Sequence, residues 1–441
     1  MPAAAAMLPL LAPGDARATL WQRGAQRITR AAFLQAAQRL ADEMRGEAGP
    51  LINLCESREG FALTLAAALL ARRPLLLPPS VAPAALREIA ATHGARRVVA
   101  DREEQAAGLP WRAAPQVEAL DVATAPALPP IAAGTIAAIP FTSGSTGHPQ
   151  PHAKTWGELV RTARLSMRRF VPDGGASIVA TVPPQHMYGL ETSVLYALAG
   201  GLATHGARPL FPADVADALT QMEAPRLLVT TPLHLRALLA AGAALPPLAR
   251  IVSATAPLSV ELAAAAEARF GAPVEEIYGC TEAGSLATRR TVEGEVWRLH
   301  EGATLVAHED GAALHGAHLP APVWLHDRIE PLDDGRFRLL GRSADLLKVA
   351  GKRMSAADLT QKLLLIPGVE DGVIVPPDGA RERLAAVVVA PNVSEAEILR
   401  ALAQQVDPVF LPRPLKRVAQ LPRNEIGKLS RAQLAALLGE S

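Results

Sequence analysis

The sequence has very little cysteine, few aromatic residues and almost no net charge. Its two cysteines, Cys55 and Cys280, are too few and too far apart for a disulfide framework or a zinc site. With 4% aromatic residues and a formal net charge of +1, neither base stacking nor electrostatic attraction favours nucleic acid as a partner. The low cysteine content fits a reducing compartment, and we expect a cytoplasmic protein.

Long apolar runs are also missing. The longest, Phe61–Ala71, is too short to span a bilayer, so we expect a buried helix there and no membrane span. The apolar start of the chain has no basic residue before Arg17, so we expect a loose terminus rather than a signal peptide. Apolar residues make up 49% of 441, which is ample for the cores of two or three domains or subdomains. The oligomeric state stays open.

Lysine is scarce, because only six of the 44 basic residues are lysines. An ammonium group is a compact point charge on a flexible stem, and arginine does not replace it where such a charge must reach a reacting group. In an arginine-biased chain, a lysine therefore marks a place where ammonium chemistry is needed. Lys154 and Lys428 lie beside or within the motifs that carry the functional interpretation.

Helix and strand signals alternate along most of the chain. Apolar strands are predicted at 50–55, 73–79, 96–101, 135–141, 176–183, 225–232 and 249–256, and helices at 31–44, 58–73, 82–95, 213–222, 233–242 and 259–270. Such alternation predicts parallel sheets covered by helices. A Pro- and Ala-rich stretch, 113–133, is predicted as a linker or loop.

The pattern changes near residue 290, where short strands and turns begin. Asp334-Gly335 is a hairpin signal, and a compact α+β segment follows Arg342. We therefore predict an α/β fold with a large N-terminal domain of layered sheets, residues 1–341, and a small α+β C-terminal domain, residues 342–441.

A loop rich in glycine, serine and threonine follows the strand at 135–141. It reads "FTSGSTGHP", and its central residues are Thr142, Ser143, Gly144, Ser145, Thr146 and Gly147. Backbone amides and hydroxyls in such a loop can hold an anion. A Walker phosphate loop requires a lysine directly after its last glycine, and this loop has His148 there, so the Walker interpretation fails.

This loop resembles the phosphate loop of the adenylate-forming superfamily, which includes acyl-CoA synthetases, aryl acid ligases, luciferases and peptide-synthetase adenylation domains. Five further segments match the family in the family's order. They are "PPQHMYGLE" (183–191), "SATAPLS" (253–259), "IYGCTEAG" (277–284), "LHDRIEPLDDGRFRLLGRSADLLKVAGKR" (325–353) and "LPRNEIGKLSR" (421–431). The resemblance covers nearly the whole chain, with a shortened N-terminus.

The resemblance implies a site for ATP and Mg²⁺ between the large domain and a mobile C-terminal lid. It implies that Tyr278 lies on adenine, Thr281 meets the phosphate, Glu282 carries magnesium and Asp327 holds the ribose hydroxyls. Further nucleotide-binding positions are Ala254, Thr255, Ala256 and Gly279. Lys428 matches the catalytic lysine. The implied hinge is Arg342, Ser343, Ala344 and Asp345.

The chemistry asks for the same residue types. A carboxylate is a poor acyl donor, and its attack on the α-phosphate of ATP gives an acyl-adenylate and pyrophosphate. That transition state gathers negative charge, so a cation and a magnesium ion stabilise it. Lys428 supplies the first and Glu282 holds the second in this interpretation.

The sequence departs from the family beside the phosphate loop and at the hinge. Gln150 and Pro151 replace the usual Lys-Gly. Two interpretations of Lys154 stay open: it supplies the missing charge, with His152 as a weaker candidate, or it is a surface charge at a helix start. At the hinge, Ala344 stands where the family often has an acid.

The predicted acyl pocket comprises His186, Tyr188, Gly189, Ser253 and Cys280. His186 is predicted to line the pocket and counts among the catalytic candidates, Tyr188 is either a pocket wall or simply buried, and Cys280 packs without acting as a nucleophile. Either His186 or Tyr188 is a candidate partner for a substrate hydroxyl. The segment lacks the aspartate with which peptide-synthetase domains hold an α-ammonium, so an amino acid substrate is not expected.

The segments "GSTGHPQPHAKTW" and "TVPPQHMYGLE" resemble most the short ligases of aryl-polyene (xanthomonadin-type) pigment clusters. That likeness implies that a small carboxylic acid of the hydroxybenzoate type is loaded onto the 4'-phosphopantetheine of an acyl carrier protein. A ligase that uses free coenzyme A with an aryl or medium-chain acid is the alternative. A non-catalytic adenylate-binding module is a third, against which Glu282, Asp327 and Lys428 argue.

Overall fold

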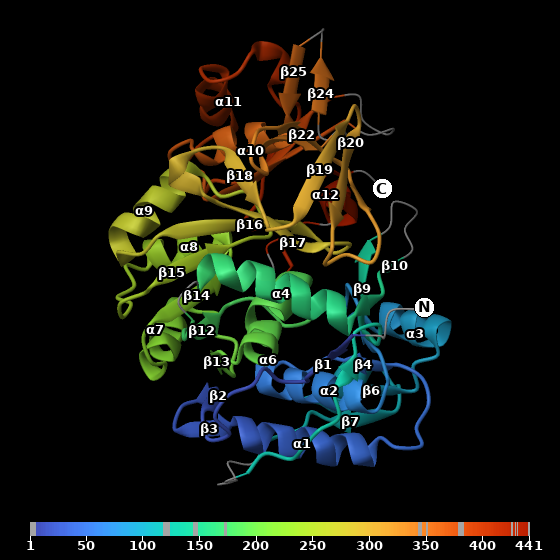
Figure 1. Ribbon diagram of the computed structural model, residues 1–441. Helices are drawn as coiled ribbons and strands as arrows, with labels where there is room; N and C mark the ends of the chain where they lie inside the picture. Colours follow the sequence, from blue (N-terminus) through green and yellow to red (C-terminus); the bar gives the residue numbers. More distant parts are fainter. Residues whose placement is uncertain are drawn as a thin grey trace.

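Two large sheets and their covering helices make up most of the molecule (Figure 1). The computed structural model describes residues 6–117, 124–143, 149–171, 174–342, 346–349, 352–377, 383–424, 427, 429 and 431–439. No helix in these ranges is both long and apolar enough to cross a membrane.

The first sheet has the order β10-β9-β5-β4-β6-β7, with β11 also paired to β9. Its parallel strands are β4 (Leu51–Asn53), β5 (Leu75–Leu77), β6 (Arg97–Ala100), β7 (Trp111–Ala113) and β9 (Ile136–Ser143). Two short antiparallel strands join β9, namely β10 (Pro149–Pro151) and β11 (Lys154–Thr155). The helices of this part are α1 (Arg30–Glu43), α2 (Arg58–Leu70) and α3 (Pro83–His93).

The second sheet has eleven strands in the order β22-β23-β18-β17-β16-β15-β14-β12-β13-β2-β3. Its parallel centre comprises β2 (Thr19–Arg23), β12 (Ser177–Ala180), β13 (Ala203–His205), β14 (Arg226–Thr230), β15 (Arg250–Ser253) and β16 (Val274–Cys280). Antiparallel strands close both sides: β3 (Gln26–Thr29), β17 (Gly284–Arg290), β18 (Val296–Leu299), β22 (Asp327–Pro331) and β23 (Arg336–Arg342).

Helices α7 (Pro212–Gln221), α8 (Pro232–Ala240) and α9 (Val260–Phe270) pack with this sheet in one apolar core. Helix α4 (Trp156–Phe170) crosses the middle of the molecule, between the two sheets (Figure 1), and its apolar side belongs to the largest core. A π-helical segment, Leu190–Leu195, links α5 (Met187–Gly189) to α6 (Tyr196–Gly200).

The C-terminal segment forms its own small α+β unit with a separate apolar core. It contains β24 (Leu346–Val349), β25 (Lys352–Ser355), α10 (Ala356–Leu364), β26 (Asp371–Val375), β27 (Ala385–Val389), α11 (Glu395–Ala403), β28 (Leu415–Arg417) and α12 (Arg431–Leu438). A three-stranded sheet, β19 (Ala303–His308), β20 (Gly311–Gly316) and β21 (Val323–Leu325), precedes it. The predicted α/β class is confirmed, whereas the domain boundary between 341 and 342 stays a prediction.

The predicted strands and helices are found within a few residues of their expected bounds, and the hairpin at Asp334-Gly335 is confirmed by positive φ angles of 58° and 67°. For helix α4, a helix start near Lys154 was one interpretation of the sequence, and no bounds were predicted. Its four arginines obscure an apolar spacing, at positions 156, 159, 160, 163, 167 and 170, that is typical of an amphipathic helix. Thr155 caps its start by accepting a hydrogen bond from the Glu158 amide.

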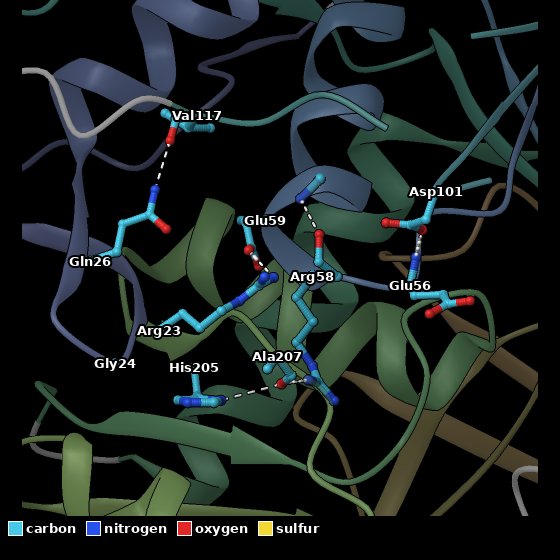
Figure 2. Close-up of polar contacts among 12 residues, drawn as sticks. Arg23, Gly24, Gln26, Glu56, Arg58, Glu59, Asp101, Val117, His205 and Ala207 are labelled. Atoms are coloured by element: carbon cyan, nitrogen blue, oxygen red, sulfur yellow. Dashed lines mark hydrogen bonds and ion pairs between the residues drawn. The ribbon is translucent and has the colours of Figure 1, made fainter. Parts of the chain in front are cut away.

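A buried arginine ties the two sheets together. Arg58 begins α2 and is fully buried, and its guanidinium donates to the carbonyls of Ala180, Val182 and Ala207. Figure 2 shows the contact with Ala207. Those carbonyls lie just after β12 and β13 of the second sheet, or at their ends. Burial lowers the pKa of Arg58 to about 9, so the group stays charged at neutral pH.

We expect Arg58→Met to destabilise the protein by about 3 kcal/mol or more, because three buried carbonyls lose their donor. Arg102→Met is the matched control, since Arg102 forms an exposed ion pair with Glu56 at 3.0 Å and its loss should cost about 0.5 kcal/mol or less. Urea unfolding followed by circular dichroism measures both. Equal midpoints for the two variants would contradict the bridging role.

Candidate active site

An aromatic wall forms at the carboxyl end of β16. The Tyr278 hydroxyl donates to Asp327 Oδ2 at 2.8 Å, so the structure brings together the two residues predicted for adenine and ribose. The Tyr278 ring lies 5.6 Å from the Trp297 ring and 6.0 Å from the Phe337 ring, measured between centroids. Carboxyl ends of parallel strands are the usual place for ligand binding in open α/β sheets.

An ion pair behind this wall holds it in place. Glu276 is buried and contacts Arg289 at 2.5 Å, and the Arg289 guanidinium carbon lies 4.6 Å from the centre of the Trp297 ring. Glu276 also accepts the Leu258 amide at 3.1 Å, which fixes the loop after β15. Sequence reasoning missed Glu276, Arg289 and Trp297. Only Trp297 carried a local signal, as one of five tryptophans.

The loop after β15 contains the predicted adenine positions Ala254, Thr255 and Ala256. Thr255 has a φ angle of +81°, which is uncommon for a β-branched residue and typical of functional loops. Ser253 is fully buried, and its hydroxyl has no hydrogen-bond partner among the described residues. This loop and Gly279 of β16 lie at the ends of adjacent parallel strands.

Thr142, His152 and Glu282 form a line of polar side chains near the end of β9. Thr142 Oγ1 lies 2.9 Å from His152 Nε2, and that nitrogen lies 3.7 Å from Glu282 Oε1. Thr281 and Glu282 follow β16 and are half-buried. Ser143 is the last residue of β9. Gly144, Ser145, Thr146 and Gly147 lie outside the described residues, so the phosphate-holding role of the loop stays a prediction.

Lys154 points into the protein. It is 3% exposed, its ammonium lies 2.6 Å from Glu158 Oε1, and it donates to the backbone carbonyl of Glu282. The interpretation of Lys154 as a surface charge is therefore wrong. Its positive charge is paired with Glu158 and supports the main chain of Glu282. The spacing of four residues between Lys154 and Glu158 is typical of an ion pair on a helix, but it does not indicate whether that pair is buried.

Glu282 fits a magnesium ion of the kind that binds with ATP. No group of three or more His, Cys, Asp or Glu side chains arranged to hold a metal occurs among the residues that the structure describes. Magnesium bound through one carboxylate, waters and substrate phosphates needs no such group. The half-exposed Glu282 carboxylate offers the hard oxygen ligand that this mode requires. The ion would neutralise charge on the phosphates.

Tyr188 is anchored to the second sheet. Its hydroxyl donates to the carbonyls of Thr230 and Val252, at 3.0 and 2.9 Å, and burial holds its pKa well above the usual value. The only proton of this hydroxyl is therefore in use, which argues against Tyr188 as a donor to a substrate hydroxyl. The neighbouring His186, the first residue before α5, is half-buried, and Gly189 is buried.

Cys280 is half-buried and packs against the core beside Tyr278. Burial, and after it the charge of the nearby Glu282 carboxylate, raises the pKa of its thiol to about 12. The thiol is therefore neutral at physiological pH, which agrees with a packing role and not with a nucleophile.

Of the predicted hinge positions and the catalytic lysine, only Arg342 belongs to the described chain. Arg342 ends β23 directly opposite Asp327 in the antiparallel register. Ser343, Ala344, Asp345 and Lys428 lie outside the described residues, so their roles stay predictions. The C-terminal unit approaches the site, because the Gln361 side chain of α10 donates to the Pro257 carbonyl at 3.3 Å.

We expect Lys154→Met to raise the magnesium concentration needed for ATP–pyrophosphate exchange about 10-fold or more, because Glu282, the predicted metal ligand, loses a hydrogen bond that supports its main chain. Mn²⁺ binding measured by electron paramagnetic resonance should weaken in parallel. Lys154→Met/Glu158→Leu removes both buried charges, so it should recover thermal stability without recovering metal affinity.

Arg73→Met is the matched control for that experiment. Arg73 is 4% exposed and pairs with Glu47 at 2.6 Å. It lies just before β5, whereas Glu282 lies near the opposite end of the parallel strand β9. Its loss should lower stability and leave the magnesium dependence unchanged. Normal metal affinity in Lys154→Met would contradict the supporting role.

Comparison with known proteins places these features in a family. Residues 11–307 match the family described as AMP-binding enzyme. The chain is 34% identical over 302 residues to a 4-coumarate–CoA ligase of Rhodobacter capsulatus, covering 67% of this chain and 75% of the relative. It is 30% identical over 306 residues to a 4-coumarate–CoA ligase of Halorhodospira halophila, covering 65% and 73%.

Solved structures share the fold over nearly the whole chain. The anthranilate CoA ligase AuaEII in complex with anthranoyl-AMP has a TM-score of 0.80 at 18% identity, covering 97% of this chain and 98% of that one. The o-succinylbenzoate CoA synthetase of Bacillus subtilis with ATP and magnesium has a TM-score of 0.78 at 17% identity, covering 95% and 96%. The chain therefore belongs to the AMP-binding enzyme family, and it is an ATP-dependent, AMP-forming acid–thiol ligase.

Proposed function

We propose that the protein activates a planar aryl acid of the hydroxybenzoate or hydroxycinnamate type as its acyl-adenylate and transfers the acyl group to a pantetheine thiol. One observation carries the substrate class: the only carboxylate of the segment 183–191, Glu191, is already in use inside the protein. An acyl pocket without a free carboxylate in this segment favours an uncharged substrate body.

Glu191 is 3% exposed and lies in a network of serine partners. It accepts hydrogen bonds from the Ser166 hydroxyl at 2.6 Å, from the Ser285 amide at 3.0 Å and from the Ser285 hydroxyl. Burial raises its pKa, and the serine donors oppose that shift. A substrate ammonium group would have to compete with three donors for this carboxylate, which disfavours α-amino acids.

The second sheet supports the segment 183–191, here called the acyl segment, through Tyr188. Tyr188 offers an apolar ring whose hydroxyl faces the carbonyls of Thr230 and Val252. A flat aromatic acid packs well against such a rigid ring. His186 then becomes the remaining candidate in this segment for a hydrogen bond to a substrate hydroxyl.

In the proposed reaction, one group of residues stabilises charge on the phosphates and another holds the nucleoside. The substrate carboxylate attacks the α-phosphate of ATP, and the bond to pyrophosphate breaks. Lys428 stabilises the charge that gathers in this step, and Glu282 provides the carboxylate ligand for magnesium. Tyr278 and Asp327 hold the nucleoside, so that the acyl-adenylate stays in place until a thiolate attacks its carbonyl carbon and releases AMP.

Free coenzyme A is the acceptor that the relatives favour, because the similar proteins are named as CoA ligases. A carrier protein in aryl-polyene pigment biosynthesis is the second candidate, and it is supported by the likeness of "GSTGHPQPHAKTW" and "TVPPQHMYGLE" to the ligases of those clusters. Both acceptors present the same pantetheine thiol, so the reaction steps are identical.

We expect Lys428→Ala to reduce adenylate formation by a factor of about 10² or more, while thiol transfer from a supplied acyl-adenylate survives. Lys416→Ala is the matched control, since Lys416 is an exposed lysine of β28 in the same C-terminal unit. Pyrophosphate release and single-turnover transfer measure the two steps. Equal loss of both steps in Lys428→Ala would point to misfolding or to a different role.

We expect pyrophosphate release to be faster with hydroxybenzoates and 4-coumarate than with any proteinogenic amino acid, because a buried ammonium without a counter-charge costs several kcal/mol. The same assay with Glu191→Gln tests the network, since this change keeps the shape of the side chain and removes its charge. Turnover with an amino acid and none with aryl acids would overturn the substrate proposal while the adenylation chemistry stood.

A competition experiment then assigns the acceptor. Preformed acyl-adenylate on the enzyme is offered equal concentrations of coenzyme A and a phosphopantetheinyl carrier protein, and the thioester products are counted by mass spectrometry. A large excess of acyl-CoA supports the first candidate, and a large excess of acyl-carrier protein supports the second.

A further inference from the structure

An arginine-lined cavity of about 670 Å³ lies outside the site described above. It is bounded by the last turn of α4, by the turn after β18 and by the β22–β23 hairpin. Four arginines line it, Arg168, Arg169, Arg298 and Arg336. None of them belongs to the nucleotide or acyl positions.

One of these arginines is already paired. Arg168 lies 2.8 Å from Glu301, and both side chains are exposed. The other three form no ion pair with a carboxylate in the described part of the chain: Arg169 donates to the Thr288 hydroxyl at 3.3 Å and Arg336 to the Asp333 carbonyl at 3.2 Å. Two carboxylates, Glu301 and Asp334, also line the cavity. The four arginines outnumber them, so the net charge of the cavity lining is positive.

The positions of these arginines place like charges together. Arg298 and Arg336 are direct partners in the antiparallel pairing of β18 and β23, so their side chains share one face of the sheet. Like charges directly opposite each other destabilise a strand pair. Arg298 is also the partner of Thr288 across β17–β18, and Thr288 is the residue that Arg169 contacts. Arg298 and Arg336 therefore lie on the same face of the sheet as Thr288, the residue that Arg169 contacts, and all three arginines line the cavity.

Burial and repulsion act on Arg169 in the same direction. Its pKa is lowered, first by burial and then by the charge of Arg298. A half-buried guanidinium close to a second guanidinium, with no carboxylate to pair with, destabilises the free protein. A bound anion would pair with both groups and relieve this repulsion.

The arginine face and the nucleotide wall are opposite faces of one ribbon. Trp297 and Phe337 are partners in the β18–β23 register and contact Tyr278, whereas the next pair, Arg298 and Arg336, points to the other side. An anion held by the arginines is therefore separated from the adenine position by the thickness of the sheet, and it is not the ATP of the reaction.

We propose that this cavity is a second anion site, which binds a phosphate group through Arg169, Arg298 and Arg336. Guanidinium forks match phosphate oxygens in pairs, and three of them suit a group with several oxygens better than a single carboxylate. The phosphate has two sources with the same chemistry, a free phosphate ion or the phosphates of an adenosine 3',5'-bisphosphate unit.

The test measures thermal stability of the full-length protein in sodium phosphate, in adenosine 3',5'-bisphosphate and in sodium chloride of equal ionic strength. Phosphate should raise the Tm of the wild-type protein by about 1–3 °C above the chloride value. A larger rise at lower concentration with the bisphosphate identifies the nucleotide as the source, and equal rises identify free phosphate.

Arg298→Gln gives the decisive comparison. In chloride it should raise the Tm, because it removes one of two opposed charges, and it should abolish most of the phosphate-dependent rise. Misfolding cannot produce this pair of results. Arg27→Gln is the matched control, since Arg27 is an exposed arginine 3.8 Å from Glu223, and it should keep the wild-type response.

Two outcomes overturn the proposal. If Arg298→Gln and the double variant Arg169→Gln/Arg298→Gln keep the full phosphate-dependent rise, the ion binds elsewhere, as at the ATP site. If phosphate and chloride stabilise the wild-type protein equally, the cavity holds no phosphate.

Discussion

The guanidinium of Arg58 is the contact on which the arrangement of the two sheets depends. A cation at the start of a helix opposes the helix dipole, so this position is unfavourable unless the group finds strong acceptors. Three backbone carbonyls at or just after the carboxyl ends of β12 and β13 supply them. Val182, one of the three, directly precedes the segment that carries His186 and Tyr188. The same contact therefore joins the sheets and sets where the acyl segment leaves its strand.

The active site inherits its rigidity from buried charges that never touch a substrate. Glu276 and Arg289 support the aromatic wall, Lys154 and Glu158 support the turn that presents Glu282, and Glu191 ties the acyl segment to β17. The two ion pairs and the single carboxylate are costly to bury, and accurate hydrogen-bond geometry offsets that cost. The lysine that the phosphate loop lacks is thus present nearby, but it acts on the protein backbone.

The fold and the motifs could be predicted because their signals come from neighbouring residues. The supporting contacts could not be predicted, because they join residues far apart in the sequence. Strand and helix signals depend on neighbouring residues, as do the glycine-rich loop and the hairpin at Asp334-Gly335. Arg58 meets Ala180 across 122 positions, and Glu191 meets Ser285 across 94. A single sequence carries no signal for such pairings. The direction of Lys154 was also open, because an ammonium four residues before a glutamate suits a surface and a core equally.

The Tyr188 hydroxyl bridges two neighbouring parallel strands, at Thr230 of β14 and Val252 of β15. Because the spacing of hydrogen-bonded strands is nearly constant at about 4.8 Å, the sheet itself determines how far this ring reaches. If Tyr188 lines the acyl pocket, as proposed, the position of its ring sets how deeply an acyl group can enter. Substitutions of residues around the ring can therefore change the range of accepted acids without disturbing the sheet. A substitution of Tyr188 itself would also remove the hydrogen bonds at the ends of two central strands.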